Sequence, residues 1–230
     1  MARPDPLGRA MLDYQRGDYG TGDLQYRDGE RSERGRVAGN YFGEAAASPW
    51  KEFVEGPVVD VGCGAGRDAL WFQERHQTLA TDASARAVRA ARERGVERVA
   101  ATDMFGLALP DGAVRSVYCV GTQAGLSGSL VGLSRLLSEF ARVTDAGGRA
   151  VVDAHDPDRG EDLFGYRADP RPGLARRAFH FEYRGETGRA LLFLLASPDR
   201  FREAAAATEW TVEDVSRKPE GPHYALLLAK

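Results

Sequence analysis

The sequence predicts an α/β protein built on a doubly wound, mostly parallel sheet of seven strands, with an antiparallel last strand and an added β-hairpin. Apolar runs alternate with helical stretches from Val58 onward, the order that produces parallel strands with helices on both faces. A glycine-rich turn follows the first apolar run, and two extended stretches near the C-terminus flank the turn sequence KPEGP. A chain of 230 residues is long enough for one such domain.

The first four strands are predicted from short apolar runs at 57–61, 77–82, 98–103 and 116–122. A helix is expected from about Arg67 to Arg75 between the first two strands. A second helix is expected after Ser84, which has the short polar side chain of an N-cap, and it ends at Gly95. These alternations predict the parallel half of the sheet.

The second half begins with a helix in which Leu130, Leu133, Leu137 and Phe140 recur at three- and four-residue intervals. The sequence DAGG at 145–148 is expected to stop this helix before a fifth strand at 149–155. An insert rich in proline, glycine and arginine follows. We then expect a hairpin from RRAFHFEY and RALLFLLA, a helix starting near Ser197 and Pro198, and a closing antiparallel pair from TVEDVSR and HYALLLAK.

We divide the chain into an N-terminal arm or lid at 1–45 and a main domain at 46–230, with the insert and hairpin at about 156–196. The N-terminal segment is polar and glycine-rich but carries Tyr14, Tyr41 and Phe42, which suits either a solvated arm or a lid over a site.

Composition limits the classes of partner. The formal net charge is −3, from 34 acidic and 31 basic residues, so no basic surplus favours nucleic acid or anionic lipid. The two cysteines, Cys63 and Cys119, have no metal-site spacing and are too few for a disulfide framework. The opening MARPDPLGRA lacks an apolar signal region, and the longest apolar run, 190–196, is too short to span a bilayer. We therefore expect a cytoplasmic protein that binds neither membranes nor nucleic acid, and the oligomeric state stays open.

The stretch DVGCGAG at 60–66 predicts a ligand-binding turn after the first strand. Gly62, Gly64 and Gly66 allow close approach of the backbone to a ligand. A triphosphate-binding loop requires Lys and Ser or Thr after its glycines, but Arg67 and Asp68 follow here. The dinucleotide pattern places its last glycine where Arg67 stands. Because Asp60 would repel a pyrophosphate and attract a cationic amine, the loop favours a ligand with a positive end.

The sequence from Asp60 to Gly66 resembles the first motif of class I S-adenosylmethionine-dependent methyltransferases. LLSEFARVTDAGGRAVV is similar to the helix, turn and fifth strand of that family, so the resemblance extends over roughly 58–230 and implies its Rossmann-like fold. It implies that Asp60 accepts a bond from the cofactor ammonium, that Asp82 accepts from the ribose and that Asp103 accepts from the adenine. The cofactor-binding residues expected in this way are Asp60, Gly62, Cys63, Gly64, Gly66, Asp82, Ala83, Asp103, Met104 and Val120, with Tyr41 closing over the sulfonium.

Several of these positions have simpler interpretations. Asp82 suits a dinucleotide site equally well, or an ordinary polar strand end. Asp103 also suits a turn or a cap. The expected catalytic residue is His155, which follows the fifth strand beside Asp153 and Asp156 and would act as a general base, although a hydrogen-bonded strand-end histidine has the same pattern.

The acceptor is expected to be a small molecule. The stretch VGTQAGLSG after the fourth strand contains Thr122 and Gln123 but not the Asn/Asp-Pro-Pro-aromatic motif for methylation of bases and planar amides in this family. His180 is expected on the face of the hairpin opposite three aromatic residues, as part of a hairpin that covers the core. Arginines in and after the insert suit an anionic acceptor or a solvated face: Arg167, Arg171, Arg176 and Arg177.

Together these observations predict a methyltransferase that uses S-adenosylmethionine, yields S-adenosylhomocysteine and acts on an unidentified small molecule. Two alternatives remain open at this point. One is a nicotinamide-dependent oxidoreductase, which shares the sheet and Asp82. The other is a protein that binds the cofactor without catalysis, because a fold does not fix a function.

Overall fold

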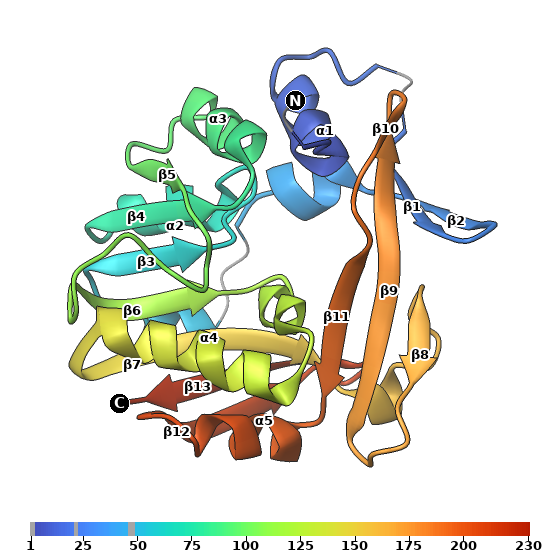
Figure 1. The fold of residues 1–230 in the computed structure, drawn as a ribbon. Coiled ribbons are helices and arrows are strands. Elements are labelled where there is room, and N and C mark those ends of the chain that lie inside the picture. Colours follow the sequence, from blue (N-terminus) through green and yellow to red (C-terminus); the bar gives the residue numbers. More distant parts are fainter. Residues whose placement is uncertain (1–2, 21–22, 46–48) are drawn as a thin grey trace.

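The computed structural model describes residues 3–20, 23–45 and 49–230, and these form two sheets whose strands run in different directions (Figure 1). The larger, seven-stranded sheet has the order β12-β13-β7-β6-β3-β4-β5. Its strands are β3 Val58–Val61, β4 Thr78–Asp82, β5 Val99–Ala101, β6 Val114–Cys119, β7 Thr144–His155, β12 Thr211–Arg217 and β13 His223–Ala229. Only β13 runs antiparallel to both of its neighbours, so the predicted fold class is confirmed.

The order of the strands fixes where a ligand can bind. From β3 the chain moves outward to β4 and β5, and it then returns to β6 on the other side of β3. In doubly wound sheets the ligand lies at this reversal, beyond the carboxyl ends of the strands. The glycine loop after β3 and the loop after β6 are therefore at the expected position.

The helices of the main sheet are α2 Arg67–Gln73, α3 Ala85–Glu93, α4 Leu130–Val143 and α5 Pro198–Ala205. Serine caps begin three of them, as Ser84 shows: its Oγ accepts a hydrogen bond of 2.9 Å from the Ala87 N–H. Ser197 caps α5 with Pro198 at its first position, which the sequence predicted.

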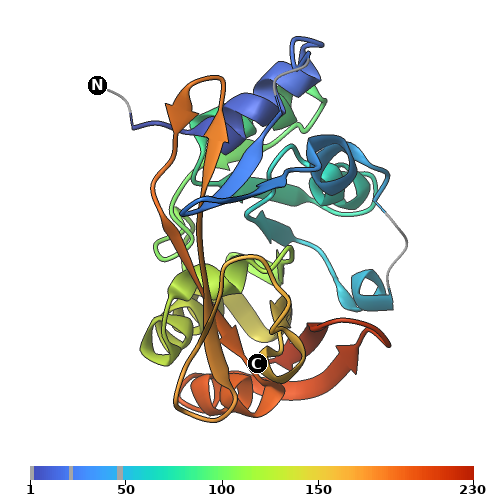
Figure 2. The same ribbon diagram turned by 90° about the vertical axis from the view of Figure 1, so that its right-hand side faces the viewer.

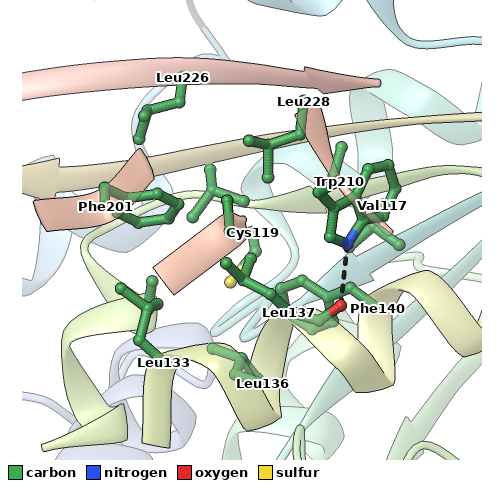
Figure 3. Close-up of a cluster of buried hydrophobic side chains, with 14 of the residues drawn as sticks. Val117, Cys119, Leu133, Leu136, Leu137, Phe140, Phe201, Trp210, Leu226 and Leu228 are labelled. Carbon is green, nitrogen blue, oxygen red and sulfur yellow. Dashed lines mark hydrogen bonds between the residues drawn. The ribbon is translucent and has the colours of Figure 1, made fainter. Parts of the chain in front are cut away.

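The main core lies between α4, α5 and the sheet (Figure 3). Leu133, Leu136, Leu137 and Phe140 of α4 are fully buried against strands on the other side of the cluster. Trp210, just before β12, donates a hydrogen bond of 2.8 Å from its indole nitrogen to the Leu137 carbonyl. The predicted spacing of apolar residues therefore does form the buried face of α4.

One prediction about this region is wrong. The sequence DAGG does not form a turn ahead of the strand, because β7 begins at Thr144 directly after α4. Val114 is paired with Thr144 and Ser116 with Arg149, so residues 145–148 form a bulge within the strand. Gly147 has φ +76°, a conformation that suits glycine and explains why the bulge forms here.

The second sheet joins the predicted hairpin to the N-terminal segment. It contains β1 Gln25–Asp28, β2 Arg31–Arg34, β8 Tyr166–Ala168, β9 Leu174–Tyr183, β10 Glu186–Thr187 and β11 Leu191–Ala196. The antiparallel pair of β9 and β11 is the expected hairpin. The pairing of β1 with β9, with Tyr26 opposite Phe181, was not predicted. Figure 2 shows β1 and β2 extending from the side of this hairpin.

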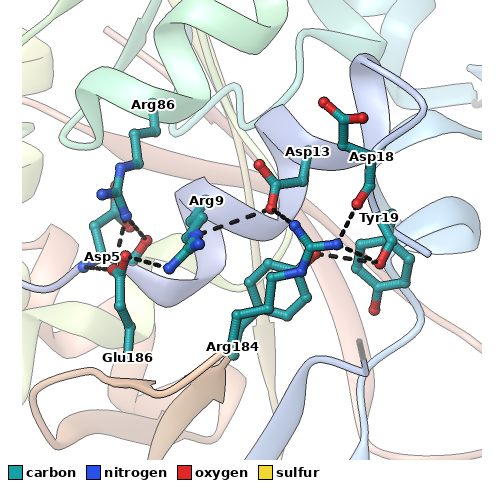
Figure 4. A network of polar contacts seen from close by, with 9 residues as sticks. Asp5, Arg9, Asp13, Asp18, Tyr19, Arg86, Arg184 and Glu186 are labelled. Atoms are coloured by element: carbon teal, nitrogen blue, oxygen red, sulfur yellow. Dashed lines mark hydrogen bonds and ion pairs between the residues drawn. The ribbon is translucent and has the colours of Figure 1, made fainter. Parts of the chain in front are cut away.

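The N-terminal segment also contains α1 Pro6–Gln15, the π-helical turn η1 Ala38–Phe42 and the short helix η2 Pro49–Phe53. Polar contacts fix α1 between α3 and the tip of the hairpin (Figure 4). Glu186 accepts hydrogen bonds from Arg9 at 2.9 Å and from Arg86 at 2.7 Å, and Arg184 forms an ion pair with Asp13 at 2.9 Å. The predicted domain boundary at 45/46 reaches residues 46–48, which lie outside the described part of the chain.

Among the described residues, no helix combines the length and the apolar character that crossing a membrane requires.

Candidate active site

The glycine loop after β3 has the backbone conformation that its sequence suggests. Gly62, Gly64 and Gly66 have φ values of +75°, +56° and +80°, which side chains other than glycine adopt only with strain. A Cβ atom on Gly62 would lie 2.7 Å from Cγ of Gln123, and one on Gly66 would lie 2.4 Å from Cγ2 of Val96. Gly66 thus allows the loop to pack against the end of α3, whereas Gly62 faces the loop after β6.

Asp60 lies at the base of this loop and is almost completely buried, with 3% of its surface exposed. Its Oδ2 atom has no hydrogen-bond partner within the described residues. Burial raises the pKa of Asp60 well above its usual value, and the nearby carboxylate of Asp68 adds to the rise. A buried carboxylate oxygen without a partner is costly, so a cationic donor bound here would be stabilised.

Lys51 is a neighbour of Asp60 that the sequence did not reveal. It is 3% exposed, and its Nζ forms an ion pair with Oδ1 of Asp68 at 2.6 Å. The geometry of this contact is not that of a hydrogen bond, so Nζ has no hydrogen-bond partner within the described residues. The ammonium group also lies 5.0 Å from the centre of the Trp71 ring. Lys51 opposes the rise in the Asp60 pKa but is outweighed by burial. A lone lysine in the sequence PWKEF belongs to no recognisable motif and gives no sign of this position.

Asp82 connects the end of β4 to the glycine loop. Its Oδ2 accepts from the Gly64 N–H at 3.0 Å, and its Oδ1 accepts from the Ser84 N–H at 2.8 Å. Burial raises the pKa of this carboxyl group. Each oxygen keeps a lone pair, so the same side chain can position the loop and still accept from a ligand hydroxyl. Ala83 beside it is exposed.

The remaining predicted cofactor residues lie along the same edge of the sheet. Asp103, after β5, is exposed and accepts a hydrogen bond of 3.0 Å from the Phe105 N–H, so it forms the turn that was its simpler interpretation. Met104 is half-buried against the main core, and Val120, after β6, is half-buried against a neighbouring cluster. Cys63 lies in the loop, where burial raises the pKa of its thiol well above the usual value.

Tyr41 of η1 covers the glycine loop. A Cβ atom on Gly64 would lie 3.1 Å from Cδ1 of Tyr41 and 3.5 Å from Sδ of Met11. Arg94, at the end of α3, donates to the Tyr41 carbonyl at 2.9 Å and to the Phe42 carbonyl at 3.0 Å. Burial raises the pKa of the Tyr41 hydroxyl. The N-terminal segment therefore lies directly on the loop, and the contact of Met11 was not foreseen.

On the other side of the point where the strand order reverses, Asp153 holds the loop after β6 in place. It is 1% exposed and accepts hydrogen bonds from the Gly121 N–H at 2.9 Å, the Thr122 N–H at 2.5 Å and His223 Nε2 at 2.7 Å. Thr122 has φ +60°, which is strained for a β-branched residue. The two amide hydrogen bonds to one buried carboxylate hold the loop in this strained conformation.

His155 and His223 lie next to each other at the carboxyl end of β7. The two residues are paired across β7 and β13, and their ring centres are 5.9 Å apart. Burial, with the positive charges of Arg177 and His223, lowers the pKa of His155 to about 4, so this imidazole is neutral near pH 7. His223 was missed because it is 70 residues from its partner Asp153, and only the strand register brings them together.

The structure separates the four arginines of the insert region. Arg167 forms an ion pair with Asp28 at 2.5 Å and Arg171 with Asp169 at 2.8 Å, both with exposed side chains. Arg176 is half-buried. Arg177 lines a small cavity with His155, Thr122 and Phe193. Of the four, only Arg177 borders the candidate site.

His180 lies as predicted, on the opposite face of β9 from the buried Phe179, Phe181 and Tyr183. Its Nε2 lies 3.2 Å from Oε1 of Glu182. This contact is on the outer face of the second sheet, so His180 is not part of the candidate site.

Comparisons with known proteins agree with this geometry. Residues 58–148 match the model of a family described as "Methyltransferase domain". An S-adenosylmethionine-dependent methyltransferase from Bacteroides fragilis, solved with S-adenosyl-L-homocysteine, has a TM-score of 0.81 at 18% identity, over 99% of this chain and 95% of that one. CalS10, an amino pentose methyltransferase from Micromonospora echinaspora, has a TM-score of 0.56 at 17% identity, over 75% and 82%. A search of curated proteins gives no match.

Proposed function

We propose that this chain is a class I S-adenosylmethionine-dependent methyltransferase that methylates a small-molecule acceptor bound at the carboxyl ends of β6 and β7. The family match of residues 58–148 and the fold support this proposal. The matching family is one of methyltransferases, so it gives no support to the oxidoreductase alternative.

The unpartnered oxygen of Asp60 carries the cofactor part of this proposal. It lies buried beside a loop whose glycines leave room for a ligand, and its carboxylate suits the ammonium of a bound amino acid moiety. Asp82 suits the ribose hydroxyls because its two oxygens already accept from backbone N–H groups and retain acceptor capacity. The residues therefore fit S-adenosylmethionine.

The cofactor supplies an electrophilic methyl group on a sulfonium centre. The chain's own residues position the reactants and exclude water. Tyr41 and Met11 cover the glycine loop, and Gln123 lies against Gly62, so the cofactor side and the acceptor side of the site adjoin at that residue. Positioning of this kind lets a nucleophile approach within about 3 Å in the correct direction, which is a large part of catalysis in methyl transfer.

Two histidines are available to an acceptor that must lose a proton. We propose that His155 lines the acceptor pocket in its neutral form, because a pKa of about 4 makes it a weak base near pH 7. His223 is better supported as the base, since Asp153 accepts from its ring at 2.7 Å and holds the imidazole in one orientation. Asp153 is in this view a positioning residue.

A small acceptor is favoured over a polymer for two reasons. The net charge of −3 gives no general attraction to nucleic acid. The cavity beside His155 is bordered by strands of the second sheet, which limits the space for a large acceptor there. Among the similar structures, CalS10 is an amino pentose methyltransferase, which is a small-molecule activity of that protein.

Calorimetric titration of the purified protein with S-adenosylhomocysteine, 5′-methylthioadenosine and NAD tests the cofactor assignment. 5′-Methylthioadenosine lacks the amino acid part of S-adenosylhomocysteine. Asp60→Asn should therefore weaken the binding of S-adenosylhomocysteine alone, by roughly tenfold or more, because it removes a charge-assisted hydrogen bond. Asp82→Asn should weaken both compounds. Asp111→Asn, at an exposed ion pair with Arg142, is the matched control.

Equal weakening of the two compounds by Asp60→Asn would remove the ammonium contact from the proposal. Binding of NAD with no binding of S-adenosylhomocysteine would contradict the function as a whole.

A further inference from the structure

Arg177 is a half-buried cation whose charge is not neutralised by the protein. Its Nε donates to the Phe164 carbonyl at 2.9 Å, and its guanidinium lies 5.0 Å from the centre of the Phe179 ring. Within the described residues no carboxylate lies within ion-pair distance of it, and its two terminal nitrogens make no hydrogen bond. Burial lowers the pKa of this guanidinium, as expected for a cation removed from water without a counter-ion.

Arg176, the preceding residue of β9, also forms no ion pair in the described structure and has a buried Nε without a hydrogen-bond partner, but it does not line the cavity beside His155. The other arginines nearby are paired. Arg167 and Arg171 have acidic partners at the surface. Arg94 is also partly buried and its pKa is lowered, but both of its terminal nitrogens donate to backbone carbonyls of Tyr41, Ala65 and Phe42. Arg177 therefore combines terminal N–H groups that remain available for a ligand with a position at the cavity.

The position of Arg177 places its terminal N–H groups beside the candidate site. Burial alternates along β9, which places Arg177 on the same face as the buried Phe179 and Phe181. The guanidinium borders the cavity that is also lined by His155, Thr122 and Phe193. The cavity has a volume of about 10 Å³, about the space of one water molecule, so a bound anionic group would contact the guanidinium at the opening of this cavity.

The charges around this cavity favour an anion. The carboxylate of Asp153 is buried and already accepts from two backbone N–H groups and His223. The positive charges of Arg177 and Lys218 both act to lower the pKa of His155, which lines this cavity. A planar guanidinium with free terminal nitrogens binds a carboxylate or a phosphate through two parallel hydrogen bonds.

We propose that the acceptor of this methyltransferase is a small molecule that carries an anionic group, a carboxylate or a phosphate, and that Arg177 binds this group while another atom of the acceptor receives the methyl group. This inference rests on the proposed function, because it names the substrate class of the same site. Arg177 acts here as a specificity-determining residue and takes no part in the transfer itself.

Binding of three probe compounds to the protein saturated with S-adenosylhomocysteine tests the inference. Benzoate and phenyl phosphate carry the two anions on a ring that can pack against Phe193 of the cavity. Benzamide is the neutral counterpart of benzoate. We expect at least one anion to bind the wild-type protein and to bind Arg177→Met about tenfold more weakly or not at all. Arg171→Met, at an exposed ion pair, should bind like the wild type.

Equal binding of benzamide and benzoate to the wild type, unchanged anion affinity in Arg177→Met, or no binding of either anion would overturn the inference. The anion that binds identifies the source, carboxylate or phosphate. If Arg177→Met does not fold, Arg177→Lys keeps the charge, and the ¹⁵Nε resonance of Arg177 in the wild type should shift with the bound anion but not with benzamide.

Affinity for S-adenosylhomocysteine separates the two proposals. It should be the same in the wild type and in Arg177→Met. Failure of S-adenosylhomocysteine to bind the wild type would count against the proposed function, and the probes would then be titrated without it to read the anion site by itself.

Discussion

Three aspartates at the carboxyl ends of the strands show how burial and hydrogen bonding give one residue type different roles. Asp153 accepts from two backbone N–H groups and a histidine, and Asp82 from two backbone N–H groups. Asp60 has a buried oxygen that lacks a partner within the described chain. Asp153 is therefore best suited to hold protein structure, whereas Asp60 is best suited to bind a ligand.

The low pKa of His155 predicts how stability depends on pH. Its folded-state pKa of about 4 is below the 6.5 of an ordinary histidine, so between these values the unfolded chain binds the additional proton. The free energy of unfolding should fall as the pH decreases from 7 toward 4, and His155 should account for about 2 kcal/mol of this fall at pH 5. The charged or titratable groups acting on it are Arg177, His223, Asp153 and Lys218.

Urea denaturation of the wild type and His155→Gln at pH 7 and pH 5 measures this contribution. The variant should lose less stability between the two pH values than the wild type. His180→Gln, on the outer face of β9, controls for the loss of an imidazole. Parallel losses in the wild type and His155→Gln would show that His155 titrates normally in the folded protein.

For single residues, the sequence predicted which side chains lie at the site better than it predicted the contacts that they make. Asp60, Asp82 and His155 could be found because each follows an apolar run that ends at one edge of the sheet. Lys51 and His223 could not, because their contacts join residues 17 and 70 positions apart in the chain and neither lies in a motif. The position of His223 is fixed by the register of β13 on β7, and that of Lys51 by the packing of η2 near α2.

A buried hydrogen bond joins α4 to Trp210, the residue just before β12, within the main core. The indole N–H of Trp210, which is 3% exposed, donates to the Leu137 carbonyl (Figure 3). Trp210→Phe removes the donor and part of the ring, so the free energy of unfolding should fall by roughly 1 to 3 kcal/mol. Trp71→Phe, at a half-buried indole without a hydrogen bond in the described structure, should cost less; equal costs would contradict this role of the hydrogen bond.

Elements with a clear apolar period could be predicted from the sequence, and elements without one could not. The core strands and α4 follow the expected spacing because burial on one face selects apolar residues. The strands β1 and β2 are half-buried and exposed along their whole length, so they show no alternation to detect. The bulge in β7 has the same glycines as a helix stop, and only the pairing with β6 distinguishes the two.

On the scale of the whole molecule, the second sheet is formed by two segments that are distant in sequence. The strand β1 of the N-terminal segment pairs with β9 of the hairpin, and α1 is fixed between α3 and the hairpin tip (Figures 1 and 4). This arrangement brings Tyr41 over the glycine loop and Arg177 to the carboxyl end of β7. The order of segments along the chain does not reveal that the N-terminal segment and the hairpin belong to the same sheet.

A substitution of Arg94 would show whether the N-terminal segment limits the release of the cofactor product. Its guanidinium holds the carbonyls of Tyr41 and Phe42 against the end of α3, so it fixes the N-terminal segment over the loop without being one of the predicted cofactor residues. In Arg94→Gln we expect S-adenosylhomocysteine to dissociate several-fold faster, with a smaller change in the association rate, because the segment over the loop opens more readily.

Stopped-flow displacement of bound S-adenosylhomocysteine measures both rates. Arg92→Gln is the matched control, because Arg92 lies on the same helix and donates to the Val99 carbonyl away from the loop. If Arg94→Gln and Arg92→Gln release the nucleoside at the wild-type rate, the N-terminal segment does not limit release, and Tyr41 would be a packing residue. A faster release confined to Arg94→Gln would instead make the second sheet and the N-terminal segment a functional part of the cofactor site.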